Sequence, residues 1–82
     1  MDVEIGKQLK LGDLRVNTVV CLRAKHRPKI AITAWVRTID ETVCSFKMGE
    51  IFAVLYLYTD KEGNFFDGMR NVVEVYEYLG EI

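Results

Sequence analysis

The chain has few of the residues that most often carry covalent cross-links or chemistry. Its 82 residues include two cysteines, one histidine and one proline. Cys21 and Cys44 are too few for a disulfide framework and lack a CxxC spacing, so we expect them to be reduced in a cytoplasmic protein. The single histidine, His26, leaves most zinc arrangements without a second imidazole ligand. Cations flank His26, and Cys21 lies several residues away along the chain, so a Cys–His nucleophile pair is not expected either.

Long apolar segments and catalytic sequence motifs are also absent. The longest apolar run, Ile51 to Tyr58, has eight residues, far short of the roughly 20 that a membrane-spanning helix needs. The N-terminal residues MDVEIGKQLKLGDL mix charged and apolar side chains and lack the apolar core of a signal peptide. No Walker loop, GxGxxG, GxSxG or HExxH occurs. We therefore expect a cytoplasmic, non-enzymatic protein with no cofactor, no metal and no membrane contact.

Acidic residues are missing from one continuous stretch of the chain. Between Leu14 and Ile39 there are six Lys or Arg residues and one His, but no Asp or Glu. Residues 1–41 carry a charge of +3 and residues 42–82 a charge of −4, within a net charge of −1. This asymmetry predicts one face that suits anions and another that repels them. The alternative is a Lys/Arg-rich hairpin that serves only solubility.

Two segments with period-two alternation predict a β-hairpin. Arg15 to Ala24 and Ile30 to Ile39 alternate side chains between two faces and are rich in β-branched residues. Lys25 to Lys29 forms the turn, where Pro28 removes a main-chain donor. The register that follows places Val20 opposite Ala34 and Leu22 opposite Ile32 on the buried side, with Val19 beside Trp35 on the other side.

Further strands follow the hairpin. Thr42 to Lys47 predicts a short strand, and Glu50 to Thr59 predicts a longer one. Because the longer segment is apolar on both faces, we expect a central or doubly covered strand. Asp60 to Asn64 reads as a hairpin loop in which Gly63 supplies a positive φ, and Phe65-Phe66 begins the return strand.

The two ends of the chain are less regular. Residues 1–12 predict an irregular or short-stranded lead-in. Residues 69–79 fit helical spacing, with Asp67 as a candidate N-cap and Gly80 as a stop, but their β-branched and aromatic residues favour a strand. We favour the strand, which makes the single domain, residues 1–82, an all-β protein. The expected fold is a small five- to six-stranded SH3-like or OB-like barrel of antiparallel strands; it becomes α+β if residues 69–79 are helical.

The basic hairpin, residues 15–37, is a candidate nucleic-acid or anion-binding site. Its cations would neutralise phosphates, and Trp35 would stack on an unpaired base. The alternative for Trp35 is a position in the core, and the alternative for the loop is a solvated turn. The residues of this hypothesis are Arg15, Arg23, Lys25, Arg27, Lys29, Trp35 and Arg37.

A tyrosine surface is the second candidate site. If the pairs Tyr56/Tyr58 and Tyr76/Tyr78 lie side by side and face outward, they form a patch of the type enriched in protein interfaces; an aromatic ladder inside the barrel is the alternative. We favour a protein-interaction module, such as an adaptor, inhibitor or assembly subunit, with an unknown protein partner or self-association. The alternative hypothesis is a nucleic-acid-binding small barrel that uses the basic hairpin, residues 15–37. A stand-alone barrel of this size would suit a phage or mobile-element accessory protein.

Overall fold

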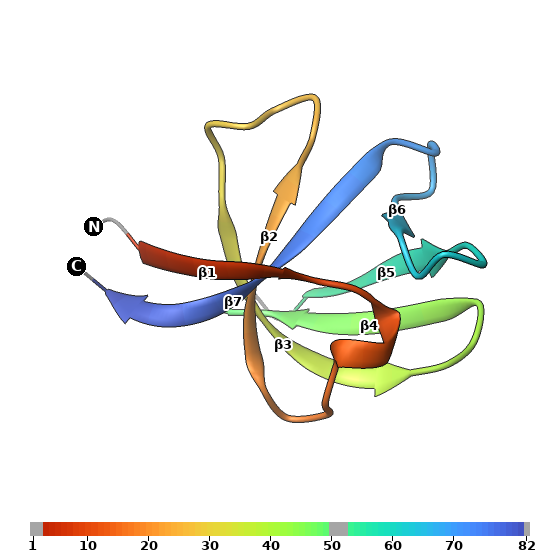
Figure 1. The fold of residues 1–82 in the computed structure, drawn as a ribbon, viewed down its shortest axis with the longest axis horizontal. Helices are drawn as coiled ribbons and strands as arrows, with labels where there is room; N and C mark the ends of the chain where they lie inside the picture. Colours follow the sequence, from red (N-terminus) through yellow and green to blue (C-terminus); the bar gives the residue numbers. More distant parts are fainter. Residues whose placement is uncertain (1–2, 50–52, 82) are drawn as a thin grey trace.

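Nearly all regular structure in this protein is β-strand (Figure 1). The computed structural model describes residues 3–49 and 53–81. Strand accounts for 61% of the structure and helix for 4%, which confirms the all-β prediction. In chain order the elements are β1 (Val3–Leu9), the 3-10 turn η1 (Leu11–Asp13), β2 (Val19–Ala24), β3 (Ile32–Ile39), β4 (Val43–Met48), β5 (Ala53–Thr59), β6 (Phe65–Phe66) and β7 (Val72–Glu81).

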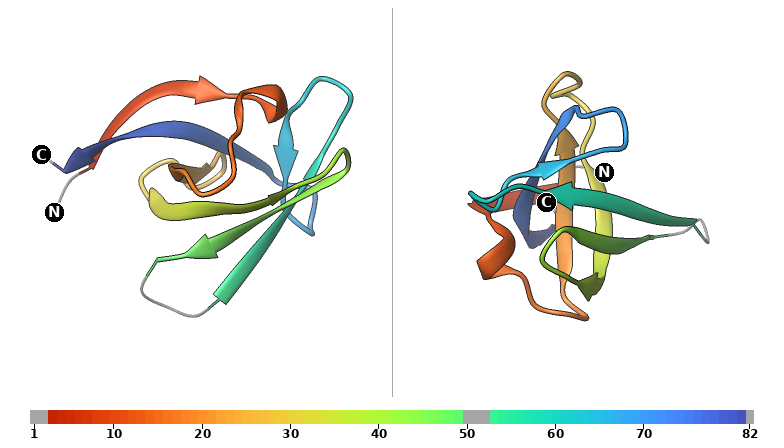
Figure 2. Two further views of the ribbon diagram at one scale, coloured as in Figure 1. Left: turned by 90° about the horizontal axis from the view of Figure 1, so that it is seen from below. Right: turned by 90° about the vertical axis from the view of Figure 1, so that its right-hand side faces the viewer.

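The strands form an antiparallel barrel with one additional strand. The order is β1-β7-β2-β3-β4-β5-β6, and a further pairing of β6 with β7 closes the barrel. This is the small SH3-like or OB-like barrel that the sequence predicts, with six strands in the closed ring. The extra strand, β1, pairs with β7 from Leu9 back to Val3. The two strands run together away from the barrel and end beside each other at the chain termini (Figures 1 and 2).

The β2–β3 hairpin has the predicted register. Val19 lies opposite Trp35, Val20 opposite Ala34, and Leu22 opposite Ile32, which confirms the pairing inferred from side-chain alternation. Both strands are shorter than predicted. β2 begins at Val19 because the residues before it form a turn, in which Asn17 has a φ of 68°.

Inward-facing side chains from all parts of the barrel form one core. Phe46 and Phe65 meet edge to face at its centre, with ring centroids 6.4 Å apart, and burial of each such side chain stabilises the fold by about 1.5–3 kcal/mol. The buried cluster consists of Leu9, Leu14, Val20, Leu22, Ala34, Val36, Cys44, Phe46, Leu57, Phe65, Val73 and Val75.

The prediction of a doubly covered strand over residues 50–59 is wrong for its described part. Leu55 and Leu57 turn toward the core, but Val54, Tyr56 and Tyr58 turn outward and are exposed. The reason is that β5 makes substantial contacts only with its neighbours β4 and β6, and no described element packs over its outer face. Residues 50–52 of the predicted strand lie outside the described residues.

The C-terminal segment is a strand, so the helical alternative is wrong. Val73 and Val75 of β7 are buried in the core, and β7 pairs with β2 along Val73 to Glu77. Asp67, the candidate helix N-cap, instead closes the turn before β7 by accepting the N–H groups of Met69 and Asn71, each at 2.9 Å. The sequence of this segment fits both helical spacing and strand composition, and pairing with the distant strand β2 selects the strand.

Candidate functional site

An aromatic surface covers the outside of β3, β4 and β5. Trp35 on β3 lies opposite Lys47 on β4, which lies opposite Val54 on β5. Tyr56 and Tyr58 follow Val54 along the same side of β5. Trp35 is 45% exposed, Tyr56 53% and Tyr58 51%, so the alternative that Trp35 belongs to the core is wrong. We call Trp35, Lys47, Val54, Tyr56 and Tyr58 the aromatic face.

The aromatic face has a hollow beside Trp35. The Lys47 ammonium lies 5.8 Å from the centroid of the indole ring, a cation–π geometry. A hollow of about 290 Å³ beside the ring is lined by Trp35, Lys47, Asn17, Val36 and Arg37. The register of the β3–β4 pair shifts by one residue between Val36 and Thr38. Arg37 is therefore an extra residue in β3, and it lies on the edge of the hollow. An aromatic wall with cations beside it suits a planar ring or an anionic group.

Apolar side chains continue from the other end of the aromatic face around the barrel. Tyr58 lies opposite Phe66 on β6, and Phe66 lies opposite Val72 on β7. A second hollow, of about 380 Å³, is lined by Tyr58 and Phe66 with Asp67, Gly68 and Arg70. The exposed aromatic surface therefore extends past the edge of β5 toward the loop before β7.

The four tyrosines of the predicted interface do not lie side by side. Tyr76 lies opposite Gln8 and Cys21, and Tyr78 lies opposite Ile5, whereas Tyr56 and Tyr58 are on β5, which does not pair with β7. Tyr76 and Tyr78 are also only partly exposed. The predicted patch is therefore divided, and Tyr56 and Tyr58 join Trp35 instead.

Arg23 is held by its neighbours in the sheet. Its guanidinium donates to the Tyr76 hydroxyl at 2.8 Å and lies 4.8 Å from the centroid of that ring. The Glu74 carboxylate is 3.7 Å away. These contacts come from β7, which pairs with β2 over this stretch. Arg23 is therefore a structural cation and is not available to a ligand in the way that the sequence suggests.

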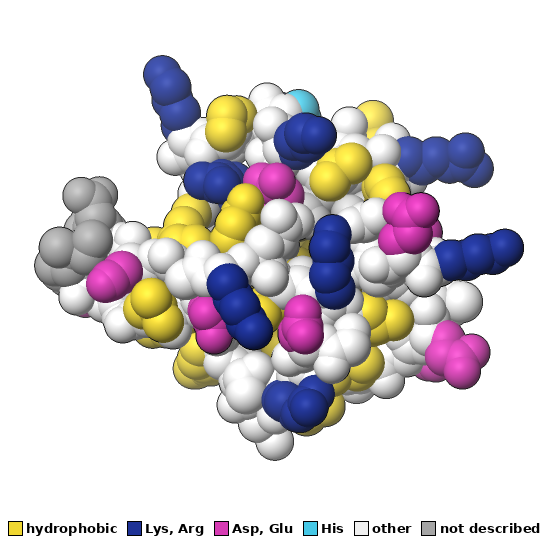
Figure 3. Space-filling model, viewed as in Figure 1, with side chains coloured by type: hydrophobic (Ala, Val, Ile, Leu, Met, Phe, Trp, Pro, Cys, Tyr) yellow, Lys and Arg dark blue, Asp and Glu magenta, His cyan; other side chains and the backbone are white. Residues whose placement is uncertain are grey.

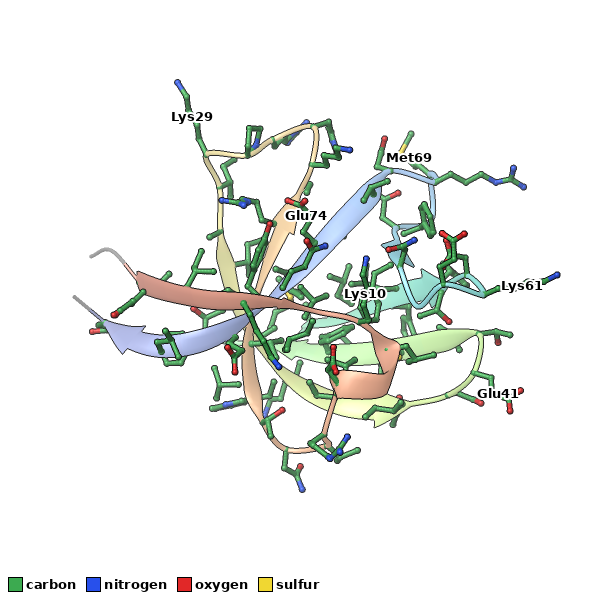
Figure 4. All side chains as sticks on the ribbon, in the orientation of Figure 1. Lys10, Lys29, Glu41, Lys61, Met69 and Glu74 are labelled. Atoms are coloured by element: carbon green, nitrogen blue, oxygen red, sulfur yellow. The ribbon has the colours of Figure 1, made fainter. Side chains whose placement is uncertain are left out.

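The remaining cations of the predicted nucleic-acid site do not converge on Trp35. The Arg15 guanidinium donates to the carbonyl of Leu14 at 2.8 Å. Lys25, Arg27 and Lys29 are exposed in the β2–β3 loop, and Lys29 points away from the barrel (Figure 4). Lys29 precedes Trp35 by six residues, which corresponds to about 20 Å of extended chain. Only Arg37 of the predicted set lies in the hollow beside the indole.

Charges of both signs lie on neighbouring strands of the sheet. β7 comes from the acidic half of the sequence, yet it lies between β1 and β2 from the basic half. Glu74 of β7 lies opposite Arg23 of β2, and the Glu77 carboxylate accepts the main-chain N–H of Lys7 on β1. Figure 3 shows Lys and Arg side chains interspersed with Asp and Glu over the face that it displays.

One end of the barrel carries a groove that the sequence reasoning missed. The groove has a volume of about 380 Å³ and lies between β5, the β2–β3 loop and the loop of residues 67–71. Met69 and Ile30, on these two loops, are strongly exposed; Figure 4 places Met69 and Lys29 at the same end of the molecule. The sequence analysis assigned Ile30 and Met69 to regular elements, residues 30–39 and 69–79, so it did not mark either residue as part of an exposed loop. We call this site the mouth groove; its lining is Leu22, Ala24, His26, Arg27, Ile30, Ile32, Leu55, Leu57, Asp67, Met69, Asn71 and Val73.

The titratable groups do not form an activated nucleophile. Cys21 and Cys44 are fully buried, and burial raises the pKa of both thiols, so they remain protonated and unreactive near neutral pH. Within residues 3–49 and 53–81, no three His, Cys, Asp or Glu side chains are grouped so that they could hold a metal ion. The same residues contain no helix long and apolar enough to cross a membrane.

In comparisons with protein-family models, curated proteins and solved structures, nothing matches this chain. The geometry of the two surfaces, the aromatic face and the mouth groove, is therefore the basis for assigning a function.

Proposed function

We propose that this protein is a non-enzymatic binding module that docks another protein on its aromatic face. One observation carries the proposal: Trp35, Tyr56 and Tyr58 are each about half exposed on one side of the barrel. Large aromatic side chains of this type are enriched at the centres of protein interfaces. They supply a large contact area at a low cost in conformational entropy.

The area involved is enough for a specific but moderate interaction. Each aromatic side chain buries roughly 150–250 Å² when it is fully covered. Because Trp35, Tyr56 and Tyr58 are each about half exposed, a partner could bury roughly 300 Å² of their surface. At about 25 cal/mol per Å² this corresponds to about 8 kcal/mol of gross stabilisation. Loss of translational and rotational freedom opposes it by at least about 4 kcal/mol. Additional contacts are therefore required for tight binding, and the apolar surface that continues past Tyr58 is in the right place to provide them.

A single-stranded nucleic acid is the second candidate ligand. It is favoured by the exposed indole of Trp35 with Lys47 over its ring and Arg37 in the adjacent hollow, because bases stack on such rings while cations contact the backbone. It ranks second because Arg23 is engaged with β7 and because the cations of the β2–β3 loop are distant from the indole. Few phosphates would then be neutralised at one time.

Affinity capture with matched variants tests the protein-binding proposal. The double variant Trp35→Ala/Tyr56→Ala removes two rings of the aromatic face. Leu79→Ala is the control, because Leu79 is equally exposed but lies on β7, in the part of that strand paired with β1. With lysate from the source organism and quantitative mass spectrometry, we expect at least one protein that is retained by the wild type and by Leu79→Ala and lost with the double variant. Identical sets of retained proteins for all three would contradict the proposal.

An oligonucleotide titration separates the second candidate from the first. Short labelled single- and double-stranded oligonucleotides are titrated at about 50 and 200 mM salt and followed by fluorescence anisotropy. The protein-binding proposal predicts no saturable binding. Salt-sensitive binding of single strands that Trp35→Ala abolishes would instead favour the nucleic-acid function.

A further inference from the structure

Strand β5 has an edge that lacks a partner over most of its length. It pairs with β4 from Ala53 to Tyr58, but with β6 only at Tyr58 and Thr59. In Figure 2, β6 lies beside only one end of β5. Among the residues that the structure describes, none forms a strand pairing with residues 53–57 on the side away from β4.

The main-chain groups on this open edge can be assigned to particular residues. Thr59 N donates to Thr42 O at 3.0 Å, so its main chain faces β4. Because N–H and C=O groups alternate between the two sides of a strand, Leu55 and Leu57 also face β4, whereas Val54 and Tyr56 face the open edge. Val54 and Tyr56 therefore present two N–H and two C=O groups to any strand that lies beside β5.

The edge of β5 lacks the features that normally prevent strand pairing. β1 also has a free edge, but its pairing with β7 is interrupted by two register shifts. The Lys7 N–H in this irregular part of β1 is bound at 3.0 Å by the Glu77 carboxylate, and Glu4 and Lys7 place charges along the strand. Such bulges and charges block edge-to-edge association. The β4–β5 register runs without a shift, and residues 53–57 include no charged residue, proline or glycine.

The mouth groove lies beside this edge and can accept apolar side chains from alternate positions of an added strand. Leu55 and Leu57 of β5 line the mouth groove, and Leu22, Ile32 and Val73 form its other walls. A strand that pairs with Val54 and Tyr56 directs every second side chain toward the groove and the others toward the aromatic face. In recognition by strand addition, main-chain hydrogen bonds provide affinity and pockets for alternate side chains provide specificity.

Basic side chains at the rim of the mouth groove favour an acidic partner. His26 and Arg27 line the mouth groove, and Lys25 and Lys29 lie exposed in the same loop. The one carboxylate in the groove lining, that of Asp67, is already bound by the N–H groups of Met69 and Asn71. The rim therefore attracts carboxylates of a ligand more strongly than it repels them.

We infer that β5 and the mouth groove receive an extended segment of a partner protein as an added strand, with apolar side chains at alternate positions and acidic residues at its flank. This inference rests on the proposed protein-binding function and specifies the conformation and chemistry of the partner. It also gives the exposed loop cations a role that does not involve nucleic acid.

Selection from a phage-displayed library of random twelve-residue peptides tests the inference. We expect the wild-type protein to enrich peptides with alternating apolar residues next to Asp or Glu. One enriched peptide, labelled with fluorescein, is then titrated with variants. Val54→Pro removes an edge N–H and is expected to weaken binding about tenfold, the effect of one or two hydrogen bonds. Val54→Ala keeps the N–H but shortens one side chain of the aromatic face, so it measures the side-chain contribution, and Val54→Pro is expected to bind about tenfold more weakly than Val54→Ala.

A second pair of variants tests the charged rim independently of the main chain. Lys25→Glu/Arg27→Glu lies in an exposed loop and is expected to weaken binding of the acidic peptide by about tenfold or more. Exchanging the acidic residues of the peptide for lysine should restore binding to this variant. Peptides without acidic residues, or binding that is indifferent to these substitutions, would overturn the charge part of the inference.

The outcomes distinguish failure of strand addition from failure of the proposed function. If Val54→Pro and Val54→Ala bind equally while Trp35→Ala/Tyr56→Ala abolishes binding, the aromatic face is the docking site and strand addition is wrong. If no peptide is enriched, strand addition is also wrong, and the capture experiment alone decides the proposed function. If sedimentation equilibrium detects a dimer of the wild type that Val54→Pro disrupts, the strand beside β5 comes from a second copy and the inferred partner is wrong.

Discussion

Proline substitutions at adjacent positions of β5 provide a direct test of the open edge in the isolated protein. The N–H of Leu55 faces β4, opposite Phe46, whereas the N–H of Val54 faces the unpaired side. Proline lacks this N–H and its ring crowds a paired neighbour, so proline is tolerated in sheets only where the N–H points away from a partner strand. The two substitutions should therefore have very different effects on stability.

The magnitudes follow from the local contacts. Alanine substitutions at the same sites account for the lost side chains, so the difference between the proline and alanine variants isolates the main chain. We expect this difference to be about 3 kcal/mol or more at Leu55, because a ladder hydrogen bond is lost and the ring strains the strand. At Val54 we expect at most about 1 kcal/mol, because a group bonded only to solvent is removed. A domain of this size has a free energy of unfolding of about 4–12 kcal/mol, so Leu55→Pro should be largely unfolded in mild denaturant.

Guanidinium denaturation followed by circular dichroism measures these differences, since the linear dependence on denaturant gives the free energy of unfolding for each variant. Equal proline penalties at Val54 and Leu55 would refute the reasoning, because they would mean that both N–H groups are paired in the folded protein. A small penalty at Val54 also establishes that Val54→Pro is folded, as the peptide-binding test requires.

Other features of the structure lead to further measurable outcomes. Gly63→Ala should lower the free energy of unfolding by about 1–2 kcal/mol, because Gly63 has a φ of +81° and an added Cβ would lie 3.2 Å from Leu11 N. Gly68→Ala is the control and should change the midpoint of denaturation little, because an added Cβ there meets open space. The backbone N–H groups of Asn64 and Asn71, which donate to Asp60 and Asp67, lower the pKa of these carboxyls. The stabilisation that these two carboxylates give to the folded state is therefore complete above their unfolded pKa of about 4. It is lost as the pH falls through their lower pKa values in the folded protein. Acid titration should show a loss of stability below about pH 4 that Asp60→Asn/Asp67→Asn reduces, and an unchanged acid profile would contradict this. Trp35 fluorescence should be red-shifted and readily quenched by acrylamide, whereas a blue-shifted, protected indole would contradict an exposed aromatic face.

The β2–β3 register could be predicted because it depends on neighbours in sequence. Val20 and Leu22 share one face of their segment, and Ile32 and Ala34 share one face of the next, so alternation excludes every register that is shifted by an odd number of residues. The short turn at Lys25 to Lys29 then selects one of the remaining registers. The exposure of β5 could not be predicted from the same kind of pattern. Val54 and Tyr56 have the composition of buried strand residues, and the sequence contains no sign that β1 extends along β7 and leaves their outer face uncovered.

The candidate site was predicted only in part, for a related reason. The sequence singled out Trp35, Tyr56 and Tyr58 by residue type, and it assigned them to two separate hypotheses. Only the pairing of β3 with β4 and of β4 with β5 brings them onto one face. Arg23 resembles the loop cations in sequence, and its engagement becomes visible only when β7 places Glu74 opposite it.

The sequence by itself determined the all-β class, the positions of most strands and turns, and the register of the hairpin. All of these follow from side-chain alternation and from turn residues acting over a few positions. The tertiary structure decided which strand edges are paired, which cations have partners and where apolar side chains remain exposed. These properties depend on β7 joining β2, β1 and β6, and such contacts between distant parts of the chain bury or release a side chain irrespective of its local pattern.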